Sequence, residues 1–208
     1  MTRLLVCVIC LGFAGAAHAD CLTAEDFQFE TTFLHKDGGE TRITLSEDEP
    51  GAIVTEYRDG GGEPLRWTWM RHGVYPVGEQ VNASVTGEAG TTPWPTHEAQ
   101  IQTVLDGVPP KPEAGLSWQG RGTDTRSAAD GARDWPFRVT YRFDAEKEVT
   151  LSGCRYRMIG VDAEFVADGA DWAARWVYFP DFDVAVQTRG RDSRHGGDWA
   201  NGLVGIAF

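Results

Sequence analysis

The stretch Phe137-Arg138-Val139-Thr140-Tyr141-Arg142-Phe143 alternates apolar or aromatic side chains with polar ones at every position. Because successive side chains of a β-strand point to opposite faces of the sheet, this pattern places one face in a core and the other in water. Half-buried sheets of this kind are typical of antiparallel rather than parallel structure. The stretch therefore predicts a strand in an antiparallel β-protein.

The same alternation recurs on both sides of this stretch. Phe27, Phe29, Thr31 and Phe33 share one face of an expected strand, and a glycine-rich turn at residues 59–62 predicts a hairpin. Further strands are expected at residues 43–45, 53–57, 65–69, 149–151, 155–165, 175–179, 182–188 and 203–208. Together they predict a mainly β protein whose antiparallel sheet forms a curved half-barrel, a sandwich or a small barrel.

Helix signals are weak by comparison, and the sequence predicts one short helix at most. Its place is residues 96–105, where Thr96 is a suitable N-cap residue and Ala99 and Gln100 are acceptable helix formers. Pro109 and Pro110 would stop a helix soon after this segment.

The N-terminus has the features of an export signal. Arg3 is followed by an apolar run at residues 4–13 and by Ala17-His18-Ala19, a small-residue cleavage sequence. We therefore expect a signal peptide at residues 1–19 and a periplasmic or secreted protein. The apolar run is shorter than the roughly 20 residues that a membrane-spanning helix needs, so no integral membrane helix is expected. No linker divides residues 20–208, which are expected to form a single β-rich domain.

Two cysteines remain once this signal segment is removed, because Cys7 and Cys10 leave with it. Cys21 and Cys154 then have one intramolecular pairing, which an oxidising compartment would form. The alternative is a pair of buried free thiols. The sequence predicts the disulfide, with the role of fastening the N-terminus to the core.

The chain is acidic, which excludes one broad class of partner. Its net charge is -12, and removal of the signal segment takes away one arginine and no acid, leaving -13. Such a charge repels phosphate backbones, so a nucleic-acid partner is not expected.

Three stretches resemble a pattern found in bacterial envelope proteins. They are Pro112-Glu113-Ala114-Gly115-Leu116-Ser117-Trp118, Leu151-Ser152-Gly153-Cys154-Arg155-Tyr156 and Trp176-Val177-Tyr178-Phe179-Pro180-Asp181-Phe182. Proteins with this pattern have curved antiparallel sheets, mostly lack an assigned activity, and include ones similar to the half-barrel carriers that shuttle lipids or lipoproteins across the periplasm. The resemblance implies a half-barrel fold, and because its motifs are turn and strand signals, it transfers no catalytic residue.

The most polar part of the chain is residues 189–199, and it holds the first candidate binding residues. Arg189, Arg191 and Arg194, with His195, lie among glycines and could hold a carboxylate or phosphate group. The alternative is a hairpin loop whose arginines pair with surplus acids on the surface. A metal site is not expected here, because the mature chain lacks ligand pairs such as His-x-His or Cys-x-x-Cys.

Trp67 and Trp69 are the second pair of candidate binding residues. Aromatic side chains like these can form a platform for a sugar ring. The alternative is core packing, because both tryptophans alternate in step with Leu65 and would face inward with it.

Motifs of the common enzyme classes are missing from the sequence. It has no Gly-x-Ser-x-Gly turn and no glycine-rich phosphate loop after a strand, and the disulfide would leave no free cysteine nucleophile. No catalytic residue and no cofactor is therefore predicted. Paired carboxylates stay open, because 31 acids offer many pairs whose spacing across a sheet the sequence does not reveal.

Three functions from different classes remain. The first is a non-catalytic exported envelope protein that binds a lipid, a peptide or a protein partner on its concave face or at a sheet edge. The second is a small carbohydrate-active hydrolase that uses acids and tryptophan subsites. The third is a small outer-membrane β-barrel, prompted by the alternation of Val204, Ile206 and Phe208 at the C-terminus, although several prolines interrupt the expected wall strands.

Overall fold

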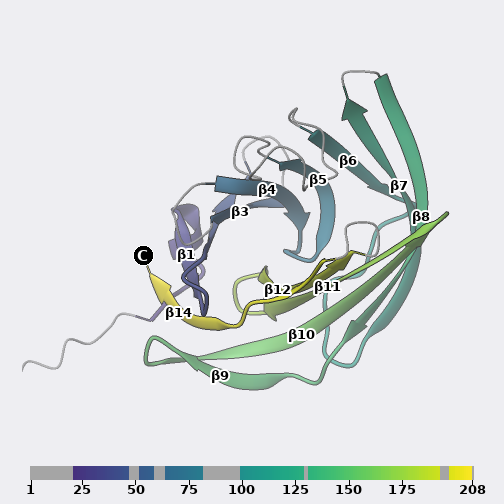
Figure 1. Ribbon diagram of the computed structural model, residues 1–208. Coiled ribbons are helices and arrows are strands. Elements are labelled where there is room, and N and C mark those ends of the chain that lie inside the picture. Colours follow the sequence, from purple (N-terminus) through teal and green to yellow (C-terminus); the bar gives the residue numbers. More distant parts are fainter. Residues whose placement is uncertain are drawn as a thin grey trace, which may run out of the picture.

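The computed structural model describes residues 21–46, 52–58, 64–81, 99–128, 131–192 and 197–207 (Figure 1). The predicted signal peptide, Arg194 and His195 lie outside these ranges. Within them the chain forms one 3-10 helix, η1 (Asp26–Gln28), and fourteen strands. The strands are β1 (Thr31–His35), β2 (Glu40–Leu45), β3 (Ala52–Arg58), β4 (Pro64–Arg71), β5 (Tyr75–Val81), β6 (Ala99–Leu105), β7 (Ser117–Ala128), β8 (Gly131–Phe143), β9 (Lys147–Leu151), β10 (Cys154–Ala167), β11 (Ala170–Phe179), β12 (Val184–Asp192), β13 (Gly197–Ala200) and β14 (Leu203–Ala207).

All of these strands belong to one antiparallel sheet. Its order is β13-β12-β11-β10-β8-β7-β6-β5-β4-β3-β2-β1-β14, and β9 pairs with β10 beside this path. Most neighbours in the sheet are also neighbours in the sequence, so simple hairpins build most of it. The sheet curves round on itself in Figure 1, and its hydrogen-bonded ladder is not closed. The expected mainly β, antiparallel, curved fold is confirmed in its half-barrel form.

The last two strands link the two edges of this sheet. β13 pairs with β12 at one edge, and β14 pairs with β1 at the other, yet only Asn201 and Gly202 separate them in the chain. The Asn201 amide donates to the carbonyl of Thr188 in β12 (2.7 Å), and the Gly202 carbonyl accepts from the Lys36 amide beyond β1 (2.9 Å). Within two residues the chain therefore passes from one edge of the sheet, beside β12, to the other edge, beside β1.

The core lies on the inner face of the sheet, as the alternation in β8 requires. Val139, Tyr141 and Phe143 are buried, whereas Arg138 and Arg142 are exposed. The ring centroids of Tyr141 and Tyr75 are 4.9 Å apart in an edge-on contact. Burial raises the pKa of Tyr141 well above its ordinary value, so this phenol stays neutral, and it donates to the Val74 carbonyl (3.2 Å).

Two hairpin turns meet inside the curve of the sheet. His72 in the β4–β5 turn and Asp183 in the β11–β12 turn both have positive φ (49° and 58°). His72 Nδ1 lies 2.9 Å from Asp183 Oδ2, and the Tyr178 hydroxyl donates to Asp183 Oδ1 (2.7 Å). Burial opposes ionisation of Asp183, but these two hydrogen bonds outweigh it and hold the pKa of the carboxyl below its ordinary value. These contacts thus join the β4–β5 turn to the β11–β12 turn.

The helix expected at residues 96–105 is wrong, because residues 99–105 form β6. Ile101, Thr103 and Leu105 are half-buried, while Gln100 and Gln102 are exposed, which is the two-residue period of a strand. β6 pairs with both β5 and β7, and these ladders outweigh the modest helix preference of Ala99 and Gln100. Over the described ranges, the chain has no helix with the length and apolar character needed to cross a bilayer.

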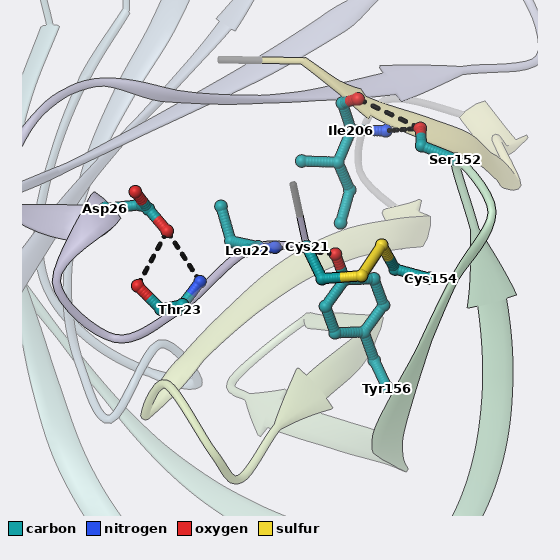
Figure 2. The surroundings of a disulfide bond; sticks show 8 residues. All are labelled: Cys21, Leu22, Thr23, Asp26, Ser152, Cys154, Tyr156 and Ile206. Carbon is teal, nitrogen blue, oxygen red and sulfur yellow. Dashed lines mark hydrogen bonds between the residues drawn. A yellow bond between two sulfur atoms is a disulfide. The ribbon is translucent and has the colours of Figure 1, made fainter. Parts of the chain in front are cut away.

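The predicted disulfide between Cys21 and Cys154 is confirmed, with its Cα atoms 5.6 Å apart (Figure 2). Next to it, the Leu22 amide donates to the hydroxyl of Tyr156 (3.0 Å). Figure 2 also shows Ser152, in the β9–β10 turn, against the C-terminal strand. Its Oγ accepts from the Ile206 amide (2.9 Å) and donates to the Ile206 carbonyl (3.0 Å). The start of β10 therefore fastens both ends of the described chain.

Candidate functional site: a cavity inside the curved sheet

The inner face of the sheet encloses a cavity of about 400 Å³, which we call the concave cavity. Its wall carries threonine hydroxyl groups from four strands of the sheet, β2, β3, β4 and β6. These come from Thr41, Thr55, Thr68 and Thr103. A volume of this size falls within the range of about 300 to 1,000 Å³ that is usual for small-molecule sites. The concave cavity is therefore the candidate site.

Strand register explains why polar side chains gather here. Thr41 of β2 lies opposite Tyr57 of β3, and Tyr57 lies opposite Arg66 of β4. Thr55 and Thr68 form the next pair on the same face. Directly opposed residues on one face have their Cβ atoms about 5 Å apart, so these side chains form a continuous patch. Burial raises the pKa of Tyr57, which keeps its hydroxyl protonated and able to donate.

Charged side chains of both signs line the concave cavity. They are Arg66, Glu79, Asp124, Arg126 and Arg191. Arg66 Nη2 donates to Gln187 Oε1 (2.7 Å), and this bond joins β4 to β12, which are not neighbours in the sheet. Asp124 accepts from the Thr103 hydroxyl (2.7 Å). Glu79 is half-buried and, in the described part of the chain, forms neither a hydrogen bond nor an ion pair. Its carboxylate is available to a ligand.

Aromatic rings complete the wall. Trp172 stacks on Phe165, with ring centroids 5.1 Å apart and an interplanar angle of 4°. Trp176 is buried, whereas Trp199 on the edge strand β13 remains 39% exposed. Trp199 lies against Gly190, where an added Cβ would be only 2.7 Å from Cε2 of the indole. Because Gly190 has no side chain, the indole can approach the backbone of β12 this closely.

The arginine-rich segment lies partly in the wall of the concave cavity. Arg189 and Arg191 are exposed on β12 and flank Gly190. Arg191 belongs to the cavity wall, and its guanidinium lies 3.3 Å from the carboxylate of Asp171. Arg189 does not line the cavity, and Arg194 and His195 fall outside the described residues. The role of these four residues in binding stays a prediction.

Trp67 and Trp69 point away from the concave cavity. Arg66, Thr68 and Met70 line it, so the alternating tryptophans lie on the opposite face of β4. Both are half-buried, and Trp67 Nε1 donates to Glu56 (2.7 Å) on the neighbouring strand. The expectation that they face the core is wrong. The prediction placed the two large rings on the inner face of β4. In the structure that face carries Arg66, Thr68 and Met70 instead.

Apart from Arg191, the charged residues that line the site were missed at the sequence level. Glu79, Asp124 and Arg126 come from β5 and β7 and share no motif. The sequence does show the alternation Arg66-x-Thr68-x-Met70. The residues that lie beside these three on neighbouring strands can be identified only once the strand register is known. In the described ranges, no three side chains of the His, Cys, Asp or Glu type gather closely enough to hold a metal ion.

Comparisons with known proteins add a likeness of fold. No protein-family model matches the chain, and no curated protein matches it. Among solved structures, the crystal structure of the hypothetical lipoprotein YmcC from Escherichia coli (K12) is similar to it, with 10% sequence identity and a TM-score of 0.46. The match covers 86% of this chain and 85% of that chain. At this identity it transfers no functional residue.

Proposed function

We propose that this chain is a non-catalytic, exported binding protein of the bacterial envelope, and that the concave cavity is its ligand site. The observation that carries the proposal is the cavity itself, of about 400 Å³. Its wall holds Glu79, which has no partner among the described residues, and the exposed indole of Trp199. Small-molecule sites combine such aromatic surface with a few polar groups that fix the orientation of the ligand.

An envelope location is supported by two features of the chain. Residues 1–19 have the pattern of an export signal, and Cys21 pairs with Cys154. Disulfides of this kind persist in oxidising compartments such as the periplasm and are rare in the cytosol.

Binding is favoured over catalysis by the composition of the cavity wall. Of the described residues that line it, none is a serine, cysteine or histidine, so the wall holds no pair of nucleophile and base of those types. Asp124 already accepts a hydrogen bond from Thr103, which leaves Glu79 as the acid without a partner among the described residues.

A carbohydrate-active hydrolase is the second candidate, and it depends on those two acids. Glycosidases require a pair of carboxylates that face the same bond. If the chain is such an enzyme, Glu79→Gln should abolish hydrolysis while leaving binding intact. A chain without hydrolytic activity, in which Glu79→Gln changes only binding, would exclude this candidate.

The test is native mass spectrometry of the protein exported to a bacterial periplasm and purified without detergent. We expect a small adduct on the wild-type chain, of mass below about 1 kDa given the usual ligand capacity of such pockets. Thr103→Trp places a large ring in the concave cavity and should remove the adduct by obstructing it. Gln102→Trp is the matched control, because Gln102 is the neighbouring residue of β6 and points to solvent.

The two variants decide the proposal between them. An adduct that is lost in Thr103→Trp and kept in Gln102→Trp supports a ligand site inside the sheet. A clean protein mass in the wild type, or an adduct that survives Thr103→Trp in the folded variant, would overturn it.

A further inference from the structure

We infer that the ligand of the concave cavity is a saccharide, held by stacking on Trp199 and by hydrogen bonds from the polar wall. This inference rests on the proposed function, because it names the ligand class of the same site. Three observations support it: the placement of Trp199, the hydrogen-bonding groups of the cavity wall, and the presence of both positive and negative side chains in that wall.

The first observation is the placement of Trp199. The indole lies against Gly190 through Nε1 and Cε2, it is 39% exposed, and it lines the concave cavity. A ring that is held by such a contact and is partly exposed offers an apolar surface to a ligand in the cavity. The C–H face of a pyranose ring matches such a surface, while its hydroxyl groups project around the edge.

The wall provides partners for those hydroxyl groups. Thr68 supplies a hydroxyl that can donate as well as accept, whereas the hydroxyls of Thr41 and Thr55 already pair with His35 Nε2 and with the Thr68 carbonyl. The Glu79 carboxylate accepts only. A saccharide hydroxyl both donates and accepts, so it can pair with Thr68 and with Glu79. A purely anionic ligand would leave the Glu79 carboxylate without a donor.

An acyl chain fits this wall poorly. Arg66, Glu79, Asp124 and Arg126 would lose water to hydrocarbon, and burying charged or polar groups without new hydrogen bonds is unfavourable. A strongly charged ligand also fits poorly. The carboxylates of the wall would repel an anion, and its guanidinium groups would repel a cation. The wall therefore selects for a polar ligand of low net charge.

The test combines composition with titration. The adduct released from the purified protein is hydrolysed in acid, and its monosaccharides are quantified. In parallel, maltotriose, cellotriose, chitotriose and myristate are titrated into the emptied protein by calorimetry. We expect monosaccharides in the adduct, heat from at least one trisaccharide, and none from myristate.

Three variants locate the interaction. Trp199→Leu should weaken trisaccharide binding about tenfold, the equivalent of one good aromatic contact. Gly190→Val should weaken it similarly while retaining the tryptophan, because the new side chain would occupy the place of the indole. Trp67→Leu is the matched control on the outer face and should bind like the wild type.

The outcomes separate this inference from the proposed function. An acyl or peptide adduct that Thr103→Trp removes would overturn the saccharide while leaving the cavity as the binding site. Trisaccharide binding that Trp199→Leu and Gly190→Val leave unchanged would overturn the inferred stacking on Trp199. If the wild type carries no adduct and gives no heat with any probe, both proposals fall.

Discussion

Gly73 shows how closely the two inner turns approach each other. It has a φ of +66°, and an added Cβ would overlap the amide nitrogen of Ala185 and lie 2.8 Å from the carbonyl carbon of Val184. Both neighbours are backbone atoms, which cannot move aside as a side chain can. Gly38 has a similar φ of +85° but nothing within 4 Å of the same position. A comparison of substitutions at the two glycines therefore separates the cost of a steric overlap from the cost of a positive φ.

We expect Gly73→Ala to destabilise the fold far more than Gly38→Ala. The Gly38 substitution should lower the free energy of unfolding by about 1 to 2 kcal/mol, the usual effect of a left-handed backbone on an L-residue. The Gly73 substitution adds overpacking against β12 and should lower it by about 3 kcal/mol or more. Urea titrations measure both. Equal losses would show that the turns do not press together at Gly73.

His35 is a buried titratable residue at the partner change between β13 and β14. It is 3% exposed, and its Nε2 lies 2.7 Å from the Thr41 hydroxyl. Burial lowers the pKa of His35, although the Asn201 backbone and the charge of Asp37 act in the opposite direction. The Tyr57 ring meets it edge-on at 5.8 Å. The folded protein thus holds this imidazole neutral.

The fold should therefore lose stability as the pH falls below about 6.5, the pKa of an unfolded histidine. Between that value and the lower folded pKa, the unfolded chain binds a proton that the folded chain does not, so acid favours unfolding. We expect urea midpoints to fall between about pH 7.5 and about pH 5. His35→Gln should reduce this slope. A slope that the substitution leaves unchanged would assign the pH dependence to other groups.

Among the elements, β14 is an edge strand with a small cap in place of a neighbour. Exposed strand edges can pair with other chains, and proteins protect them in several ways. Here the single hydroxyl of Ser152 pairs with both the amide and the carbonyl of Ile206. Ser152 has a φ of 49°, which is unusual for a residue other than glycine. The turn accepts this conformation and places the hydroxyl against the strand.

Removal of that hydroxyl should loosen β14 locally. Ser152→Ala and Ser152→Gly should both speed hydrogen exchange at the Ile206 amide and lower stability by about 1 to 2 kcal/mol. Glycine suits the positive φ, so Ser152→Gly should be the milder change. Hydrogen exchange followed by NMR makes the measurement. Full protection of Ile206 in Ser152→Gly would mean that conformation, and not the hydroxyl, matters here.

The sequence predicted strands well where one face is apolar and the other is polar, as in β8. It failed at β6, where Gln100 and Gln102 face water and the inner row of Ile101, Thr103 and Leu105 is mixed in character. It also predicted the wrong face of β4. In both strands the inner face borders the concave cavity instead of the core, so its side chains are partly polar and the alternation loses contrast.

For the whole molecule, the disulfide joins two distant parts of the chain. Cys21 and Cys154 are separated by 133 positions, and this pairing could be predicted because the mature chain offers no other. The concave cavity could not be predicted in the same way. Arg66 and Gln187 meet across it although 121 positions and several strands separate them, and only the order and curvature of the sheet bring them together.

Loss of the disulfide should destabilise the whole fold. Chain-entropy arithmetic for a loop of this length gives about 4 to 5 kcal/mol as an upper limit. We expect the variant with both Cys21→Ser and Cys154→Ser to unfold at a markedly lower urea concentration. Reductant should shift the wild type toward the variant and leave the variant unchanged. Coincident unfolding curves for the oxidised wild type and the variant would contradict this role.

The partner change at Asn201 and Gly202 has a consequence for the order in which the protein can be made. β1 lies near the start of the described chain, but its second neighbour is β14, which follows every other strand in the sequence. Cys21 likewise waits for Cys154. Hairpins from β2 to β12 can form as they emerge from the ribosome, whereas β1 stays half-paired until β14 has been made. One edge of the sheet is therefore completed only after all the strands between β1 and β14 have been synthesised.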